Sequence, residues 1–576
     1  MKTAALGPRY RVTALREMSE NGYDVLVIGG GIVGAGAALD AASRGLSVAL
    51  VEARDWASGS SSRSSKLIHG GLRYLEQLDF RLVREALKER RLLLTRLAPH
   101  LVHPVPFLFP LTHRIWERLY IGAGMTLYDV MGGLRSVVPR HRYLNHRRAL
   151  EEAPGLRPDA LVGALQYFDG RTDDARMTLA VVRTAAEYGA TVVNRARAVE
   201  LLRDGPRVTG ARVLDLESGQ EMTVRARQVI SATGVWTDQI LAMAGAEGPP
   251  IMKPSKGVHI VVPREAISLR TAMILRTEES VLFVIPWGQY WVIGTTDTRW
   301  SLDNDHPVAS RADIDYLLDH INTVLLRPLT HDDIEGVYAG LRPLLTGSAA
   351  TTAKLSREHL VAAPVPGLVI IAGGKYTTYR VMAKDAVDMA VRELGDAVPE
   401  SVTERVPLFG AAGYEARWNG RRRLAERFGL SVLTVERLLR RYGSEIGEVL
   451  DLVAADPALG QPLHGGPGYL RVEAVYAASH EQALHVEDVL TRRTHISIEE
   501  RDRGLAAASE VAALIAPVLG WDDGRRRRET ENYRLHVEAE LAAERRPDDA
   551  TAEVVLHSVP ELSASAISER DTGIHP

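Results

Sequence analysis

The 576-residue chain contains no cysteine. Its absence excludes disulfides, thiolate metal sites, iron–sulfur clusters, a redox-active dithiol and any cofactor joined through a thioether. Long hydrophobic runs are also missing, since no apolar stretch reaches the roughly 18–20 residues that span a bilayer. Residues 1–20 lack the apolar core of a signal peptide, and we therefore expect an intracellular protein that begins with a short mobile tail.

Charge of neither sign is in large excess. Lysine and arginine number 70 and aspartate and glutamate number 73, which gives a formal net charge of −3. This balance gives no reason to expect nucleic acid as a partner. The length allows two or three domains, and a hydrophobic content of 45% supports large ordinary cores.

Residues 23–52 have the pattern of a βαβ unit. A short apolar run leads into three glycines, a helical pattern of small residues follows, and a second apolar run ends at Glu52. The glycines are Gly29, Gly31 and Gly34. The first allows a tight turn, the second lets a pyrophosphate approach the backbone, and the third lets helix and strand pack closely. At the position of Glu52 a carboxylate can accept hydrogen bonds from a ribose 2′-hydroxyl. The unit predicts a dinucleotide site, with a glycine-rich structural turn as the alternative.

Two later segments have the pattern of further parts of one nucleotide site. Residues 228–238 form an apolar strand pattern that ends at Gly234, and residues 369–380 form a strand pattern that breaks at Gly373 and Gly374. FAD is long and is usually held by widely separated segments of a chain. The layout therefore favours FAD over NAD, and because no cysteine is present the flavin itself must carry the redox chemistry.

The order of the patterns predicts an α/β fold with a separate helical domain. Short strands and turns alternate over residues 191–231, a β-meander, and more strands follow over residues 256–300. From Val435 to Val453 apolar residues recur with the 3, 4, 7 spacing of a helix. We divide the chain into an N-terminal tail (1–20), an oxidoreductase region (21–398), a C-terminal helical domain (399–545) and a disordered tail (546–576).

Several strings resemble those of one family, the FAD-dependent glycerol-3-phosphate dehydrogenases of the bacterial, aerobic type, within the D-amino-acid-oxidase-like flavoproteins. The most specific are SSRSSKLIHGGLRYLE at 61–76 and GGKYTTYR at 373–380. Supporting strings are KGVHIVVP at 256–263, IGTTDT at 293–298, GLRPLL at 340–345, SREH at 356–359 and HVEDVLTRRTHI at 485–496. The resemblance covers about residues 20–540. It implies a Rossmann-like FAD-binding domain interleaved with an α+β substrate domain, followed by an all-α C-terminal domain.

The resemblance also implies the residues of a site for glycerol 3-phosphate. Oxidation of a secondary alcohol removes a hydride from carbon and a proton from oxygen, and the phosphate carries a charge of about −2. His259 and Arg342 are expected nearest the reacting alcohol, with Lys375 beside the flavin. His259 is the better proton acceptor, because an arginine stays protonated. A histidine that only orients the substrate is the alternative.

The remaining site residues bind the phosphate and the cofactor. Arg73 and Arg357 are assigned to the phosphate, because a guanidinium fork suits its oxygens, and Tyr74 supplies a further hydrogen bond. The cofactor residues outside the first glycine motif are Ser64, Ser65, Lys66, Gly234, Gly374, Lys375, Thr377 and Thr378. His69 lies near a position at which some related flavoproteins attach FAD, but the family generally binds FAD non-covalently, and we expect the same here.

The implied activity is oxidation of sn-glycerol 3-phosphate to dihydroxyacetone phosphate, with electrons passed to a membrane quinone. A glycerol-3-phosphate oxidase that uses oxygen and releases hydrogen peroxide is the alternative.

We expect a cytoplasmic protein held peripherally at the inner face of the cell membrane, and a homodimer is possible. Residues 101–133 mix aromatic side chains with Arg114 and Arg118, which suits shallow insertion at an anionic lipid surface or else a buried hairpin. Residues 525–528, four arginines, are a second candidate for lipid contact.

Overall fold

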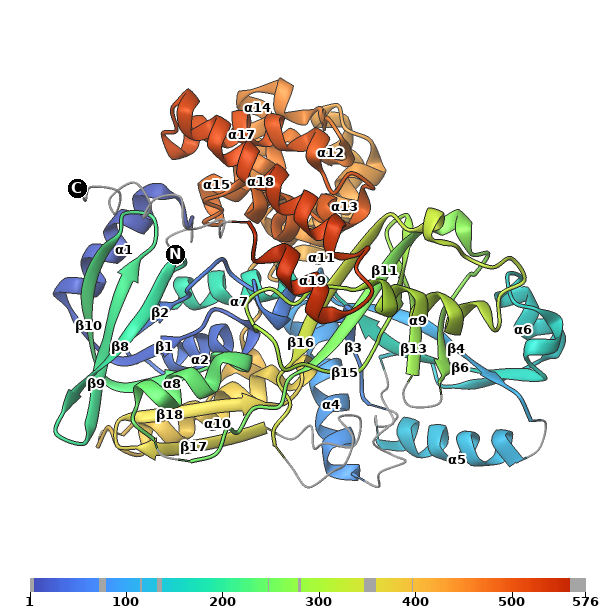
Figure 1. The fold of residues 1–576 in the computed structure, drawn as a ribbon, viewed down its shortest axis with the longest axis horizontal. Helices are drawn as coiled ribbons and strands as arrows, with labels where there is room; N and C mark the ends of the chain where they lie inside the picture. The colour runs from blue at the N-terminus through green and yellow to red at the C-terminus, as the bar shows by residue number, and fades with distance from the viewer. Residues whose placement is uncertain are drawn as a thin grey trace.

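The computed structural model describes residues 5–71, 79–113, 116–131, 137–246, 248–277, 281–346, 359–395 and 397–559. Two mixed sheets lie side by side, and the C-terminal helices pack above their junction (Figure 1). The α/β architecture with a helical C-terminal domain is therefore confirmed.

The first sheet contains the predicted dinucleotide motif. Its strand order is β17-β18-β10-β1-β2-β7, with β8 and β9 paired beside β10. The strands are β1 (Gly22–Ile28), β2 (Val48–Val51), β7 (Thr191–Val193), β8 (Ala196–Asp204), β9 (Arg207–Asp215), β10 (Gln220–Ser231), β17 (His359–Val365) and β18 (Leu368–Gly373). The pairs β1–β2, β1–β10, β2–β7 and β10–β18 are parallel, whereas β8, β9 and β10 form the predicted antiparallel meander.

Helices cover both faces of this sheet. On one face α2 (Ile32–Ser43) lies between α7 (Asp174–Glu187) and α10 (Tyr379–Val391). Alanine and glycine dominate α2 because neighbours surround it: a Cβ atom on Gly36 would lie 2.9 Å from the Tyr379 ring. On the other face α1 (Pro8–Glu20) and α8 (Thr237–Met243) pack over the meander.

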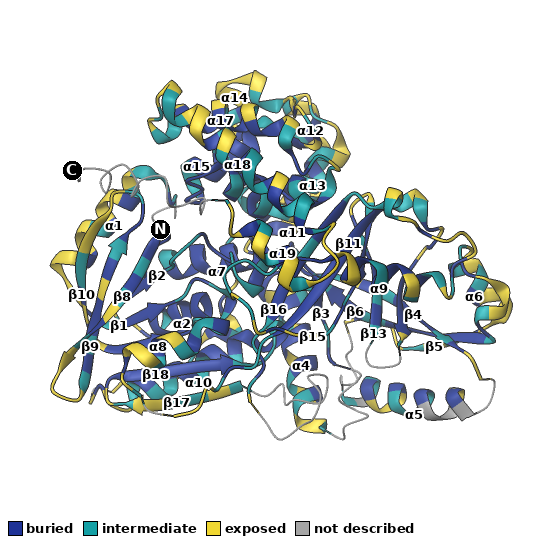
Figure 2. Cartoon of the chain, in the orientation of Figure 1, coloured by how far each residue is buried: buried dark blue, intermediate teal, exposed yellow. Residues whose placement is uncertain are grey.

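The second sheet corresponds to the part of the chain that was predicted as the substrate domain. Its strand order is β15-β11-β14-β13-β12-β4-β6-β3, with β16 paired to β11 and β5 to β6. The strands are β3 (Leu67–Ile68), β4 (His103–Leu111), β5 (Arg142–Asn145), β6 (Gly163–Arg171), β11 (Ser255–Pro263), β12 (Ala272–Arg276), β13 (Val281–Trp287), β14 (Tyr290–Gly294), β15 (Thr298–Arg299) and β16 (Gly336–Arg342). Its helices are α4 (Phe80–Leu92), α5 (Trp116–Met131), α6 (His146–Glu152) and α9 (Arg311–Asn322). The two faces carry separate cores, so the sheet is buried throughout its centre (Figure 2).

The C-terminal domain contains helices of 4 to 21 residues and one hairpin. The helices are α11 (Tyr414–Asn419), α12 (Arg421–Phe428), α13 (Val432–Tyr442), α14 (Ile446–Ala455), α15 (Arg471–His480), α16 (Ile496–Glu499), α17 (Leu505–Leu519), α18 (Asp523–Ala543) and α19 (Asp549–Leu556). The hairpin pairs β19 (Pro462–Leu463) with β20 (Gly466–Leu470). The apolar residues with helical spacing between Val435 and Val453 are all buried in one core of this domain, as their periodicity predicts.

Parts of both predicted tails are helical. Residues 8–20 form α1, which buries Ala14 and Met18, and Arg11 donates to Asp215 at 2.7 Å. At the other end α19 buries Ala552 against α18, and Asp548 caps it by accepting from the backbone N–H of Thr551. The predictions of a tail at 5–20 and of disorder at 546–559 are therefore wrong. Each helix has too few apolar residues to stand out in sequence but finds an apolar partner in the fold.

Four of the apolar side chains that mark residues 101–133 are buried in the structure. Phe107, Phe109, Met125 and Tyr128 belong to a core of the second sheet and are at most 6% exposed. Shallow insertion of these four side chains into lipid is therefore a wrong prediction, and the buried alternative holds for them. No helix in the described part of the chain is long and apolar enough to cross a membrane.

A buried histidine joins the C-terminal domain to the meander. His485 contacts Glu217 through Nε2 at 2.8 Å and Glu529 through Nδ1 at 3.1 Å. Burial lowers the pKa of His485, but the adjacent Glu217 carboxylate, helped by Glu529, raises it to about 10. Because this pKa exceeds the unfolded value of about 6.5, the stabilisation is complete below that pH and is lost as the pH rises through 10.

We expect His485→Gln to lower the unfolding temperature more at neutral pH than at alkaline pH. The difference between wild type and variant should shrink steadily between about pH 7 and about pH 10, because the wild-type imidazolium loses its proton over that range. Calorimetry of both proteins at matched pH values measures it. A difference that does not change with pH would mean that His485 acts by packing and not by charge.

Candidate active site

A cavity of about 460 Å³ lies at the carboxyl ends of the parallel strands of the first sheet. Residues at the ends of β1, β2, β10 and β18 line one side, and residues of β11 and β16 from the second sheet line another. The carboxyl edge of a parallel sheet is the usual place for a ligand in such folds. The cavity therefore joins the predicted nucleotide motif to the predicted substrate domain.

The three motif glycines have the geometry that their predicted roles require. Gly29 has a φ of +112°, and a Cβ atom there would lie 2.6 Å from the carbonyl oxygen of Ala232. A Cβ atom on Gly34 would lie 1.9 Å from the carbonyl oxygen of Gly29, so helix and strand are in direct backbone contact. Gly31 lines the cavity, and its nearest neighbour is the Ser61 hydroxyl, 3.1 Å from the position of a Cβ. The glycine backbone thus leaves a cradle that a side chain would fill.

Glu52 lies at the end of β2 and lines the same cavity. Oε2 accepts from the backbone N–H of Gly30 at 2.6 Å, and Oε1 accepts from that of Arg54 at 2.7 Å. Burial raises the pKa of Glu52, and the two N–H groups oppose the shift. A carboxylate has about four acceptor positions, so Glu52 retains capacity for ribose hydroxyls. These features fit a dinucleotide such as FAD.

Most other predicted cofactor residues also line the cavity. They are Ser64, Ser65, Gly234, Gly374, Lys375 and Thr377. Thr378 lies behind the wall, with its hydroxyl 3.4 Å from the carbonyl oxygen of Lys375. Lys66 points away from the cavity: Nζ donates to Asp174 and to the carbonyl oxygen of Ser62, both at 2.6 Å, and the side chain is 1% exposed. The prediction that Lys66 contacts the cofactor is wrong for this ammonium group, because the buried Asp174 carboxylate binds it instead.

His259 reaches the cavity from β11. Its Nε2 lies 2.8 Å from the Ser65 hydroxyl, and its ring stacks on Tyr338 with centroids 4.7 Å apart. Its Nδ1 is buried and has no hydrogen-bond partner among the described residues. Burial, and then the positive charges of Arg342 and Lys66, hold the pKa of His259 well below its usual value. The imidazole is therefore neutral near pH 7, the state in which it can accept a proton.

Arg342 ends β16, the strand that pairs with β11. The guanidinium donates to the Thr295 hydroxyl and to the carbonyl oxygen of Thr296, both at 2.9 Å, which fixes its orientation at the cavity wall. Glycine at position 257 makes room for it, since a Cβ there would lie 2.6 Å from the Arg342 guanidinium. Gly294 makes room for the His259 ring in the same way, since a Cβ atom on Gly294 would lie 2.3 Å from Cδ2 of His259.

Three of the predicted substrate residues cannot be located. Arg73, Tyr74 and Arg357 lie outside the described residues. Lys375, which follows β18, lines the cavity together with His259 and Arg342. Three of the six predicted catalytic or substrate-binding residues therefore line one cavity, and the other three stay predictions.

The sequence reasoning missed a polar group at the Glu52 end of the cavity. Arg54 pairs with Asp305 at 2.9 Å, and Trp236 donates to the same carboxylate at 2.6 Å. Arg63 also lines the cavity and donates to the carbonyl oxygen of Ala339 at 3.3 Å. Arg63 lies inside the SSRSSK string, and that string was the one sequence signal that could have placed Arg63 at the site. Nothing local marks Asp305, which lies after the IGTTDT string and outside every string named above.

Gly31→Val should give a folded protein that lacks the dinucleotide. The added side chain would occupy the backbone cradle where the pyrophosphate is expected to lie. The amount of dinucleotide released from the purified variant by heat, relative to protein, measures the loss. Gly22→Val is a matched control, because Gly22 is exposed at the first position of β1, where extended backbone accepts valine, and no atom lies within 4 Å of its Cβ position. Retention of stoichiometric dinucleotide by Gly31→Val would contradict this role of the motif.

Comparisons with known proteins agree with this site. Residues 24–384 match the family model described as FAD dependent oxidoreductase, and residues 401–526 match the C-terminal domain of alpha-glycerophosphate oxidase. Glycerol-3-phosphate dehydrogenase 2 of Mycobacterium tuberculosis is 56% identical over 98% of this chain and 96% of the relative. The mitochondrial glycerol-3-phosphate dehydrogenase of Homo sapiens is 37% identical over 94% of this chain and 76% of its own length.

A solved structure extends the agreement to the fold. The glycerol-3-phosphate dehydrogenase from Bacillus halodurans, complexed with FAD, matches with a TM-score of 0.76 and 30% identity, over 92% of this chain and 98% of that one. The family model alone spans more than half of the chain. With the glycine cradle and Glu52 at the cavity, these matches show that FAD is the cofactor and that the chain belongs to the family of FAD-dependent glycerol-3-phosphate dehydrogenases.

Proposed function

We propose that this protein oxidises sn-glycerol 3-phosphate to dihydroxyacetone phosphate, with hydride transfer to FAD and passage of the electrons to a membrane quinone. The observation that carries the proposal is one cavity lined both by the glycine motif with Glu52 and by His259, Arg342 and Lys375. A cofactor site beside the neutral imidazole of His259 and the positive charges of Arg342 and Lys375 suits a substrate that is both an alcohol and an anion. The relatives that bear the glycerol-3-phosphate dehydrogenase name support the same substrate.

The proposed chemistry divides between the cofactor and the chain. FAD, when bound, supplies the acceptor for the hydride that leaves the carbon. The neutral His259 receives the hydroxyl proton at Nε2, the nitrogen that also contacts the Ser65 hydroxyl. Arg342 polarises the reacting oxygen, because its guanidinium is already oriented by Thr295 and Thr296 and needs no rearrangement as negative charge develops. Arg73, Arg357 and Tyr74 bind the phosphate, and Lys375 adds positive charge beside the flavin.

The quinone acceptor and the membrane location are further parts of the proposal. We propose attachment to the anionic inner face of the cell membrane, supported by exposed arginines at positions 526–528 of α18. Arg525 no longer belongs to that group, since it pairs with Glu529 at 2.9 Å and with Glu217 at 3.4 Å. FAD is held non-covalently in this proposal although His69 lines the cavity. Formation of a homodimer stays a prediction.

Anaerobic mixing with glycerol 3-phosphate tests the function. We expect the flavin absorbance to bleach and dihydroxyacetone phosphate to form in equal amount, and added soluble quinone should restore the colour rapidly. Glycerol at the same concentration is the control, since it lacks the phosphate that the cations bind. Equal bleaching by glycerol would contradict the phosphate assignment. Reoxidation by oxygen as fast as by quinone, with release of peroxide, would identify an oxidase instead.

Arg342→Ala and Arg357→Ala should separate chemistry from binding. If Arg342 polarises the reacting oxygen, the flavin reduction rate at saturating substrate should fall by roughly 100-fold or more. A phosphate contact is made equally in the ground and transition states, so Arg357→Ala should mainly raise KM, with a loss in kcat/KM of about 10- to 100-fold. Stopped-flow reduction measures both. A normal reduction rate in Arg342→Ala would remove this residue from the catalytic set.

A further inference from the structure

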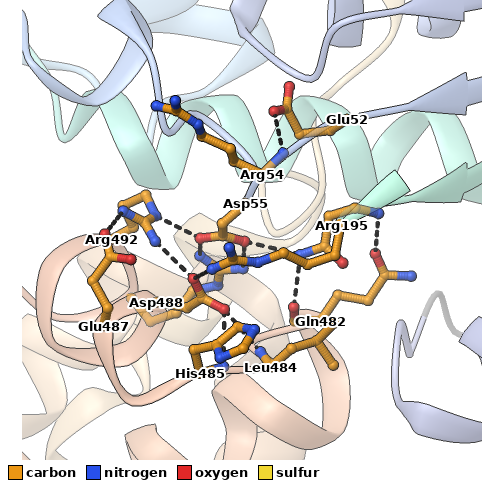
Figure 3. Close-up of polar contacts among 12 residues, drawn as sticks. Glu52, Arg54, Asp55, Arg195, Gln482, Leu484, His485, Glu487, Asp488 and Arg492 are labelled. Atoms are coloured by element: carbon orange, nitrogen blue, oxygen red, sulfur yellow. Dashed lines mark hydrogen bonds and ion pairs between the residues drawn. The ribbon is translucent and has the colours of Figure 1, made fainter. Parts of the chain in front are cut away.

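Asp55 is a fully buried carboxylate three residues after the cofactor-binding Glu52. Its Oδ2 accepts from Nε of Arg492 at 2.6 Å and from Arg493 at 2.7 Å, and its Oδ1 accepts from the other Arg493 nitrogen at 2.7 Å. Both arginines belong to the C-terminal domain, more than 430 positions along the chain. Figure 3 shows Arg492 approaching Asp55 directly beneath Glu52 and Arg54. The C-terminal domain is thus bound to the segment that carries the ribose carboxylate.

The same part of the C-terminal domain binds a second wall of the cavity. Arg195 donates to Asp488 at 2.9 Å, and Asp488 also accepts from Arg492 at 2.7 Å (Figure 3). Arg195 precedes residues 196–198, which line the cavity, and its backbone N–H donates to the carbonyl oxygen of Arg54 at 2.8 Å. Five buried residues therefore form one connected ionic group, here called the interdomain clamp: Asp55, Arg195, Asp488, Arg492 and Arg493.

Packing and backbone hydrogen bonds connect the clamp to the glycine turn of the cofactor site. Trp56 follows Asp55 and is 1% exposed, and its ring lies 2.5 Å from where a Cβ atom of Gly30 would stand. The backbone N–H of Ala57 donates to the carbonyl oxygen of Gly30 at 3.2 Å, while the N–H of Gly30 donates to Glu52. A shift of Asp55 would therefore displace both Glu52 and the glycine turn. Release of the arginines would also leave a buried carboxylate without its charge partners, which favours such a shift.

We propose that the C-terminal domain acts in FAD retention: the interdomain clamp holds the segment 52–57 in its cofactor-binding conformation. Asp55, Arg492 and Arg493 are positioning residues in this proposal and contact neither FAD nor substrate. The inference concerns FAD, the cofactor of the family, and does not depend on which alcohol is oxidised. It gives the C-terminal domain, none of whose described residues lines the cavity, a role in the holoenzyme.

The test compares FAD affinity in full-length variants. Asp55→Asn and Arg493→Gln are purified, stripped of FAD by dialysis against concentrated potassium bromide, and titrated with FAD while flavin fluorescence is followed. We expect the FAD dissociation constant to rise by about 10-fold or more, as expected for loss of a charge-assisted contact that fixes the site. At saturating FAD the substrate KM and the flavin reduction rate should return to within about threefold of wild type.

Arg183→Gln is the matched control. Arg183 is also a buried arginine that joins the oxidoreductase region to the C-terminal domain. It does so from α7, through Tyr476 at 2.7 Å, Glu448 at 3.4 Å and Glu481 at 3.8 Å. Its FAD dissociation constant should stay within about threefold of wild type even if the unfolding temperature falls.

Three outcomes would overturn the proposal. One is an unchanged FAD dissociation constant in folded Asp55→Asn and Arg493→Gln. Another is an equal rise in Arg183→Gln, which would mean that any loosening of domain docking weakens FAD. The third concerns Arg493→Lys, the variant to use if Asp55→Asn and Arg493→Gln do not fold. Lysine keeps the charge but loses the two-nitrogen contact with Asp55, so we expect Arg493→Lys to weaken FAD binding. Wild-type affinity in Arg493→Lys, measured by the same titration, would count against the clamp.

Discussion

Helix α2 approaches strand β1 so closely that a Cβ atom on Gly34 would stand 1.9 Å from the carbonyl oxygen of Gly29. This contact sets the turn between them and aims the start of the helix at the cavity, where its N–H groups and dipole favour a phosphate. Because α2 is held at that distance, α10 must approach it with Tyr379 over Gly36, and α7 packs on its other side. The nucleotide end of the cavity follows from this single backbone contact.

Charge at the domain interface obeys a different constraint. Arginines and carboxylates that are almost fully buried lose their hydration, and only close pairing compensates for that loss. Arg493 meets this condition by a two-nitrogen contact with Asp55, and Arg176 pairs with Glu481 at 2.8 Å. Removal of one partner from such a pair typically costs about 3–5 kcal/mol. The interface is therefore specific in its geometry, which is why its contacts can transmit the position of the C-terminal domain to the segment beside Glu52.

The reacting end of the cavity depends on the mutual electrostatic effect of His259 and Arg342. Burial alone lowers the pKa of His259, and the adjacent guanidinium lowers it further. The same positive charge that would stabilise developing charge on oxygen in the proposed reaction therefore also keeps the histidine in its neutral form. The antiparallel pairing of β11 and β16 brings the two residues together, and Gly257 and Gly294 provide the space that their side chains occupy.

Local patterns in the sequence predicted the features that depend on neighbouring residues: the glycine turn before α2, the carboxylate of Glu52, the meander, and the helices from Val435 to Val453. The family strings also predicted that His259, Arg342 and Lys375 share one site, and these three residues line one cavity. The three-dimensional fold decided that Lys66 is bound by Asp174 and that Arg525 pairs with Glu217. It also decided that α1 and α19 are docked helices and that Asp55 meets Arg492. The partners in these ion pairs are at least 108 positions apart, and burial selects them by the cost of an unpaired charge. The docked helices are selected by the cost of an exposed apolar face, for which no local pattern exists.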